Sequence, residues 1–307
     1  MPFLYQFAPR LVAGCVPWII RALRLPVLLL VLLGAALALG GCSALRLSYN
    51  NAPELLHWWL DGFADFDKAQ SQRARADLAE LARWHRREEL PLAADLLQSA
   101  QALASQSPSG AEICALYERS VVRMEAVVEH ALPAAAAVAL TLQAGQLRAM
   151  EATFDKNNRK WREEWLSTDG DSMARRTQKI RERLEDFYGA LTPSQVRQLQ
   201  ASMEKSGADE PLYYREILRR QRAILETLAA LRQTDASTAQ TALAALAKGY
   251  FHSPDAAYRA YKDRAVEQTC EAVAEVQRSA TAQQRKNMVK ALQGYSRDVQ
   301  ALMAQTP

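Results

Sequence analysis

Apolar residues recur with the period of an α-helix along almost the whole chain. In the last segment they fall on one stripe, made up of Met288, Val289, Leu292, Tyr295, Val299 and Leu302. No segment shows the sustained alternation of apolar and polar residues, or the Asn-Gly turns, that are typical of β-hairpins. The connecting segments are short, so neighbouring helices are expected to pack antiparallel. The sequence therefore predicts an all-α fold, a multi-helix antiparallel bundle over residues 53–307.

Capping residues and prolines predict where the helices begin and end. Asp67 precedes a long polar helix that is expected to end near Glu89, because Pro91 should break it. The alanine-rich stretch 131–142 (ALPAAAAVALTL) is interpreted as a close-packed central helix, kinked at Pro133. The most evident loop is Thr168–Ser172 (TDGDS), where two lobes would divide. After that loop, helices are expected near 173–189, 192–206, 210–233, 236–248, 254–279 and 281–305.

The first 41 residues have the pattern of an export signal. They contain three arginines and no acidic residue, and they end in the apolar run Leu25–Leu39. That run is 15 residues long, whereas a helix that spans a bilayer needs roughly 20. A cleaved signal peptide over residues 1–41 is therefore predicted in preference to a signal anchor.

The residues LGGC at 39–42 resemble the lipobox of bacterial lipoproteins. The resemblance implies cleavage after Gly41 and acylation of Cys42, with palmitate among the acyl chains, so that 42–52 becomes a lipidated tether. Ser43 follows the cysteine, which in the lipoprotein sorting pattern implies the outer membrane and its periplasmic face. The alternative is a buried thiol behind an ordinary cleavage site.

Charge gives little reason to expect a nucleic-acid partner. The chain has 38 basic and 34 acidic residues, and removing the three leader arginines leaves 35 against 34. The remaining basic clusters alternate with acidic residues at helical spacing, as in solvated, ion-paired helix faces.

Cys114 and Cys270 are the only cysteines left once Cys15 leaves with the leader and Cys42 is acylated. In an oxidising compartment they either form a disulfide, which we favour, or remain two separately buried thiols. The chain-entropy model gives such a long loop roughly 5 kcal/mol of stabilisation, less any strain in the native state.

The segment LSYNNAPELLHWWLDGFADF at 47–66 resembles the opening of an uncharacterised family of Gram-negative outer-membrane lipoproteins, a domain of unknown function. Later segments are also similar: WHRREELP at 84–91, YRAYKDR at 258–264 and QRKNMVKALQGYSRD at 284–298. The resemblance spans the mature chain and implies no known activity.

Aromatic residues of this opening segment form a candidate binding face, made up of Trp58, Trp59, Phe63 and Phe66. One interpretation is that this short helix seals the core near the tether. The other is that the face belongs to a ligand groove.

A shorter match concerns LTPSQ at 191–195, which resembles the LTxxQ signature of Spy-type periplasmic chaperones, and Thr281 and Gln284 repeat its T-x-x-Q part. Thr192 is expected to cap a helix while Gln195 reaches back to the cap. The same device is expected at two other helix starts, Asp67 with Gln70 and Ser237 with Gln240. Shared capping chemistry is therefore favoured over shared function as the explanation of the match.

The sequence has no catalytic or metal-binding pattern. Ser202 and Lys205 form an S-x-x-K without its companion motifs, and the four histidines lack ligand spacing. We therefore expect no enzyme activity, metal or cofactor. The predicted function is a noncatalytic, outer-membrane-anchored lipoprotein that binds another protein or an envelope component. The alternatives are a holdase-type chaperone and an envelope hydrolase or lipid-handling protein.

Overall fold

The computed structural model describes residues 44–166, 172–205 and 207–305, and these residues form helices joined by short connections, with no strand. The all-α prediction is confirmed. The predicted signal peptide, Cys42 and most of the loop predicted at 168–172 lie outside the described residues.

The helices have the following bounds: α2 (Ala44–Asn50), α3 (Ala52–Ala64), α4 (Lys68–Trp84), the π-helical turn η1 (His85–Glu89), α5 (Leu90–Ala104), α6 (Gly110–Ala139), α7 (Ala144–Trp165), α8 (Ser172–Tyr188), α9 (Pro193–Lys205), α10 (Glu210–Ala230), the 3₁₀ turn η2 (Leu231–Gln233), α11 (Ala236–Phe251), α12 (Ala256–Ser279) and α13 (Ala282–Met303).

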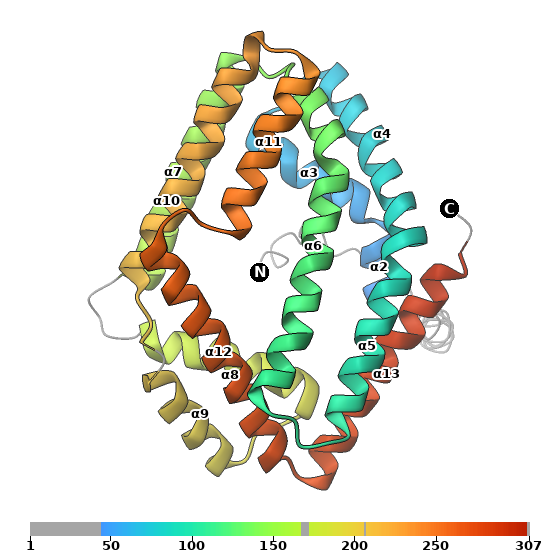
Figure 1. The fold of residues 1–307 in the computed structure, drawn as a ribbon, viewed down its shortest axis with the longest axis vertical. Helices are drawn as coiled ribbons and strands as arrows, with labels where there is room; N and C mark the ends of the chain where they lie inside the picture. Colours follow the sequence, from blue (N-terminus) through green and yellow to red (C-terminus); the bar gives the residue numbers. More distant parts are fainter. Residues whose placement is uncertain (1–43, 167–171, 206, 306–307) are drawn as a thin grey trace, which may run out of the picture. The chain divides into compact units, whose positions relative to one another are not determined.

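Residues Ser48–Pro307 form one compact unit. Within it, the long helix α6 contacts α4, α5, α11 and α12, while α3 packs on α4, α7 pairs with α10 and α5 pairs with α13 (Figure 1). The main apolar cluster joins Met150 of α7 to Leu228 of α10 and Leu243 of α11. The core thus includes residues from both sides of the loop at 168–172.

Pro91 does not break the helix, contrary to the prediction. α4, η1 and α5 follow one another without a loop, and the backbone N–H of Leu90 donates to the carbonyl of His85, five residues earlier. A proline ring inside an α-helix clashes with the carbonyl four residues before it and leaves that carbonyl without a donor. The π-turn that ends two residues before Pro91 changes the register of the hydrogen bonds, so the helical path continues through the proline.

Cys114 of α6 and Cys270 of α12 form a disulfide, with their Cα atoms 5.5 Å apart. The two helices also approach closely at the start of α6, where a Cβ atom on Gly110 would meet the backbone and side chain of Glu271. Glycine at position 110 therefore allows this approach. Of the two alternatives for the cysteines, the structure has the disulfide.

Candidate functional site

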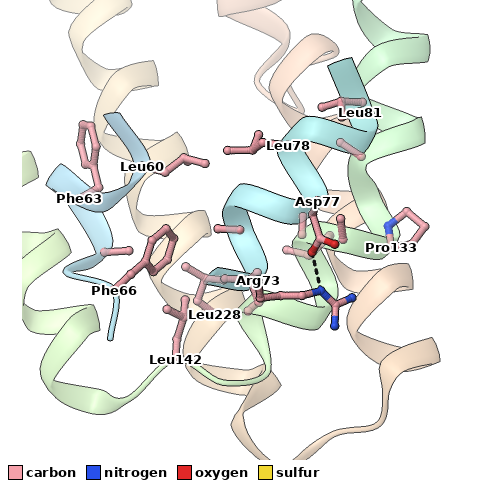
Figure 2. A pocket seen from close by; sticks show the side chains of 18 of the residues that line it. Leu60, Phe63, Phe66, Arg73, Asp77, Leu78, Leu81, Pro133, Leu142 and Leu228 are labelled. Carbon is pink, nitrogen blue, oxygen red and sulfur yellow. Dashed lines mark hydrogen bonds and ion pairs between the residues drawn. The ribbon is translucent and has the colours of Figure 1, made fainter. Parts of the chain in front are cut away.

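An apolar cavity of about 790 Å³ lies among α3, α4 and α6. Its large apolar lining residues are Leu60, Phe63, Phe66, Leu78, Leu81, Val138, Leu142, Met150, Leu228 and Leu243. Figure 2 shows Leu60 of α3 and Leu78 of α4 pointing toward one another across this space. Three different parts of the sequence therefore supply most of its walls, and α7, α10 and α11 each add one residue, Met150, Leu228 and Leu243.

The wall on α6 is built from small residues, including Ala131, Ala134, Ala135 and Ala139, together with Pro133. An alanine side chain ends at Cβ, so these positions do not fill the space toward α4. The stretch 131–142 was interpreted as close-packed, and on its α4 side that interpretation is wrong. Ala136, which does not line the cavity, packs in the main apolar cluster, and Ala139 belongs to both.

Four charged side chains line the cavity, and the three that are exposed, Arg73, Glu80 and Glu129, mark its edge toward solvent. Arg73 and Asp77 of α4 form an ion pair, with Nε and Oδ2 2.7 Å apart (Figure 2). Glu80 and Glu129 also border the cavity; both are exposed and have no ion-pair partner in the part of the chain that the structure describes. His130 stacks on Trp84, with ring centroids 3.8 Å apart. The edge therefore carries a local excess of negative charge.

The predicted aromatic face divides into two parts, one on the first turns of α3 and one at its end and just after it. Trp58 and Trp59 are 75% and 53% exposed, whereas Phe63 and Phe66 line the cavity. The interpretation that this helix seals the core fits only its last turn, because the tryptophans face solvent. Sequence reasoning missed His57, which is buried and whose Nε2 lies 2.8 Å from Oγ of Ser71 on α4.

Two segments that lie far apart in the sequence, 47–66 and 84–91, meet where α2 contacts η1. The hydroxyl of Tyr49 lies 2.9 Å from Nδ1 of His85, and Nη2 of Arg86 donates to Oδ1 of Asn50 at 2.8 Å. Burial lowers the pKa of His85, although the charge of Glu89 acts in the opposite direction. The Tyr-Asn pair is thus bound to the π-turn. Because the pKa of His85 lies below its usual value, its imidazole is neutral near pH 7.

The residues of the T-x-x-Q motif, Thr192, Gln195, Thr281 and Gln284, come together as two capping boxes that face one another. The side-chain amides of Gln195 and Gln284 donate to each other, with both N···O distances 3.0 Å. Each glutamine oxygen also accepts the backbone N–H of its own threonine at 2.9 Å. Each amide nitrogen donates further, from Gln195 to the carbonyl of Ser279 and from Gln284 to the carbonyl of Ala190. All four hydrogen-bonding positions of each amide are therefore occupied.

A second pair of boxes with the same arrangement joins α4 and α7. Gln70 and Gln146 donate to each other at 3.2 and 2.7 Å, and their oxygens accept from the N–H groups of Asp67 and Gln143. Sequence reasoning found the box at Asp67 but not its partner at Gln143. The available signal was an apolar residue before a capping box that ends in glutamine, which occurs at 66–70, 142–146 and 191–195.

The box predicted at Ser237 and Gln240 was wrong. α11 begins at Ala236, and its cap is Asp235, whose side chain accepts the backbone N–H of Thr238 at 2.9 Å. Asp235 lies two residues before Ser237, and its carboxylate caps the helix in place of the serine.

The most buried ionic cluster lies outside the cavity lining, and its carboxylate is fully paired. Glu216 of α10 is 3% exposed and accepts hydrogen bonds from Arg219, Arg220 and Ser253. Burial raises the pKa of Glu216, but these hydrogen bonds and the nearby charge of Arg220 outweigh it, so the pKa lies below its ordinary value. The cluster joins α10 to the segment after α11 and offers no unpaired reactive group.

Among the described residues, no group of three or more histidine, cysteine, aspartate or glutamate side chains has the geometry to hold a metal ion. Among the helices that the structure describes, none combines the length and apolar character needed to span a membrane.

The model of a family of unknown function (DUF6279) matches residues 62–259. The chain belongs to the DUF6279 family. The region matched to DUF6279 contains every cavity-lining residue except Leu60, while Trp58, Trp59 and Gln284 lie outside it. No curated protein and no solved structure matches the chain.

Proposed function

We propose that this DUF6279 chain is a noncatalytic binding protein of the Gram-negative envelope. Acylated Cys42 holds it at the periplasmic face of the outer membrane, and the cavity takes up an apolar ligand that contains an acyl chain. The observation that carries the proposal is the apolar cavity of about 790 Å³.

The composition of the cavity wall favours binding over reaction. No serine, threonine, cysteine or lysine lines it, so a nucleophile of the types that attack esters or amides is missing from this part of the structure. The one histidine of the lining stacks on Trp84. Of the earlier alternatives, lipid handling fits this wall better than hydrolysis does.

The size and the lining of the cavity fit an extended hydrocarbon chain. Its volume lies within the ~300–1,000 Å³ typical of ligand pockets and is several times the ~150 Å³ of an apolar cavity that binds benzene. Each buried methylene contributes about 0.8 kcal/mol. Roughly ten of them would supply about 8 kcal/mol, which corresponds to a micromolar dissociation constant.

The charges at the edge favour a ligand whose head group is neutral or zwitterionic. Asp77 offsets the charge of Arg73. The carboxylates of Glu80 and Glu129 therefore give the edge a net negative charge. A fatty-acid carboxylate near these groups would be repelled. Monoacylglycerols or zwitterionic lysophospholipids are therefore expected to bind more tightly than free fatty acids of equal length.

A fluorescent apolar probe tests this proposal. The chain from residue 42 with Cys42→Ser would be titrated with N-phenyl-1-naphthylamine, and monoacylglycerol and fatty acid would then compete for the site. Ala134→Phe places a phenyl ring on the cavity wall, and Ala76→Phe adds the same ring at an exposed position of α4 outside the lining.

We expect one saturable site in the parent and in Ala76→Phe, and binding at least about tenfold weaker in Ala134→Phe, a change of about 1.4 kcal/mol. Thermal unfolding checks that both variants fold. Equal affinity in a folded Ala134→Phe variant would show that the probe does not bind in the cavity, and would refute the proposed ligand site.

The chaperone alternative receives no support from its motif. Gln195 and Gln284 are buried, and their amides are saturated within the helix ends. They therefore stabilise the bundle and present no surface to a client protein.

A further inference from the structure

The first turns of α3 present an uncovered apolar surface outside the cavity. This tryptophan face consists of Leu55, Leu56, Trp58 and Trp59, of which the two leucines are 54% and 45% exposed. On a helix, residues three and four apart are neighbours, so Leu55 lies next to both tryptophans. On the buried side of α3, His57 contacts Ser71. The helix is therefore held with its tryptophans directed outward.

The chemistry of the tryptophan face matches the interfacial region of a lipid bilayer. Contiguous exposed apolar surface is costly in water and marks an interaction site, and tryptophan is enriched where a membrane meets water. The face itself carries no charge, and the neighbouring Glu54 pairs with Arg75 of α4. Because the face contains no basic group, its binding to a membrane is not expected to depend on anionic lipids.

The covalent chain keeps this face near the bilayer that the proposed function assigns to Cys42. Leu55 lies only 13 positions after Cys42. Even fully extended, 13 residues span at most about 45 Å, and the seven residues of α2 are helical, which shortens this reach. An acylated Cys42 therefore places the tryptophan face within the reach of its own membrane.

We propose that the tryptophan face of α3 inserts into the interface of the bilayer that carries the acyl anchor. This inference rests on the envelope location in the proposed function, and it identifies the membrane as the source of the ligand. The rings of Trp59 and Phe63 are 5.0 Å apart, and Phe63 lines the cavity. One helix thus carries both the membrane contact and one wall of the binding site, so an acyl chain has a continuous apolar surface to follow.

Vesicle binding of the chain from residue 42 with Cys42→Ser tests the insertion without the acyl chains. The probe is a sucrose-loaded vesicle of phosphatidylcholine and phosphatidylethanolamine, separated by sedimentation. The variant is Trp58→Ser/Trp59→Ser. Its control is Val122→Ser/Met124→Ser, which removes two exposed apolar side chains from α6.

The parent and the control are expected to bind, and the tryptophan variant to bind at least about tenfold more weakly, since partitioning scales with buried apolar area. Binding should change less than about twofold between roughly 0.05 and 0.5 M salt, because no charge attraction is involved. Lipids brominated in their acyl chains should quench the tryptophan fluorescence of the parent.

Three results would overturn the inference: equal vesicle binding by the tryptophan variant, loss of parent binding at high salt, or a dimer that the tryptophan substitutions dissociate and that does not bind vesicles. The cavity is tested separately by the naphthylamine probe. If probe binding persists while vesicle binding fails, only the membrane contact is refuted. If vesicle binding persists while the probe fails, only the cavity ligand is refuted.

Discussion

Replacing Gln195 with alanine should destabilise the protein far more than removing an ordinary helix cap. The side chain accepts from the N–H of Thr192 and from Gln284, and it donates to Gln284 and to the carbonyl of Ser279. At about 1 kcal/mol of net stabilisation for each hydrogen bond, Gln195→Ala should cost about 4 kcal/mol. Thr192→Ala removes only the cap and should cost about 1 kcal/mol.

The reciprocal pair also predicts a coupling energy. Gln195→Ala and Gln284→Ala each remove the two amide–amide bonds, so these bonds are counted twice when the single effects are added. The double variant should lose about 6 kcal/mol where additivity gives about 8, a coupling of about 2 kcal/mol.

Urea unfolding, followed by circular dichroism, measures each free energy of unfolding. The reasoning is refuted if Gln195→Ala costs no more than Thr192→Ala, or if the double variant is strictly additive. Gln70→Ala and Gln146→Ala repeat the same test at the other pair of boxes.

The other predictions concern the disulfide, the buried carboxylate and the anchor. Cys114→Ala/Cys270→Ala should lower the free energy of unfolding by about 2–5 kcal/mol, and a reductant should then have no further effect in urea unfolding; an unchanged midpoint would contradict this. Because the pKa of Glu216 lies below its ordinary value of 4.5, its stabilisation is present above pH 4.5 and is lost as the pH falls through the lowered pKa. The difference in unfolding free energy between the parent and Glu216→Gln should therefore narrow on acidification, and a constant difference from pH 7 to pH 3 would count against it. Cys42→Ala should remove the acyl chains from the protein, which mass spectrometry measures as the loss of their mass, whereas an unmodified amino terminus on the processed wild-type chain would contradict acylation.

Local chemistry made much of the helical framework predictable. Caps such as Asp67, Thr192 and Thr281 act within three residues of their own helix start, so the sequence contains both partners. Periodicity likewise located the helices, because each buries one stripe. The predicted helix break at Pro91 was wrong, since the π-turn that accommodates this proline has no clear sequence signal.

The candidate site depended on contacts that no local pattern contains. The sequence shows that 131–142 is rich in alanine, but only the positions of α3 and α4 decide whether those alanines face a neighbour or a cavity. The pairing of Gln195 with Gln284 required knowing which two helix starts meet, 89 residues apart along the chain. In the same way, the sequence showed that Trp58 and Phe63 are aromatic but not that one is exposed and the other lines the cavity.

Lipid analysis of the protein purified from its own membranes tests the central claim most directly. The account predicts about one non-covalent acyl lipid for each wild-type chain, detected by mass spectrometry after solvent extraction, and a clear loss of that lipid in folded Ala134→Phe but not in Ala76→Phe. No bound lipid in the wild type, or equal amounts in all three proteins, would contradict it.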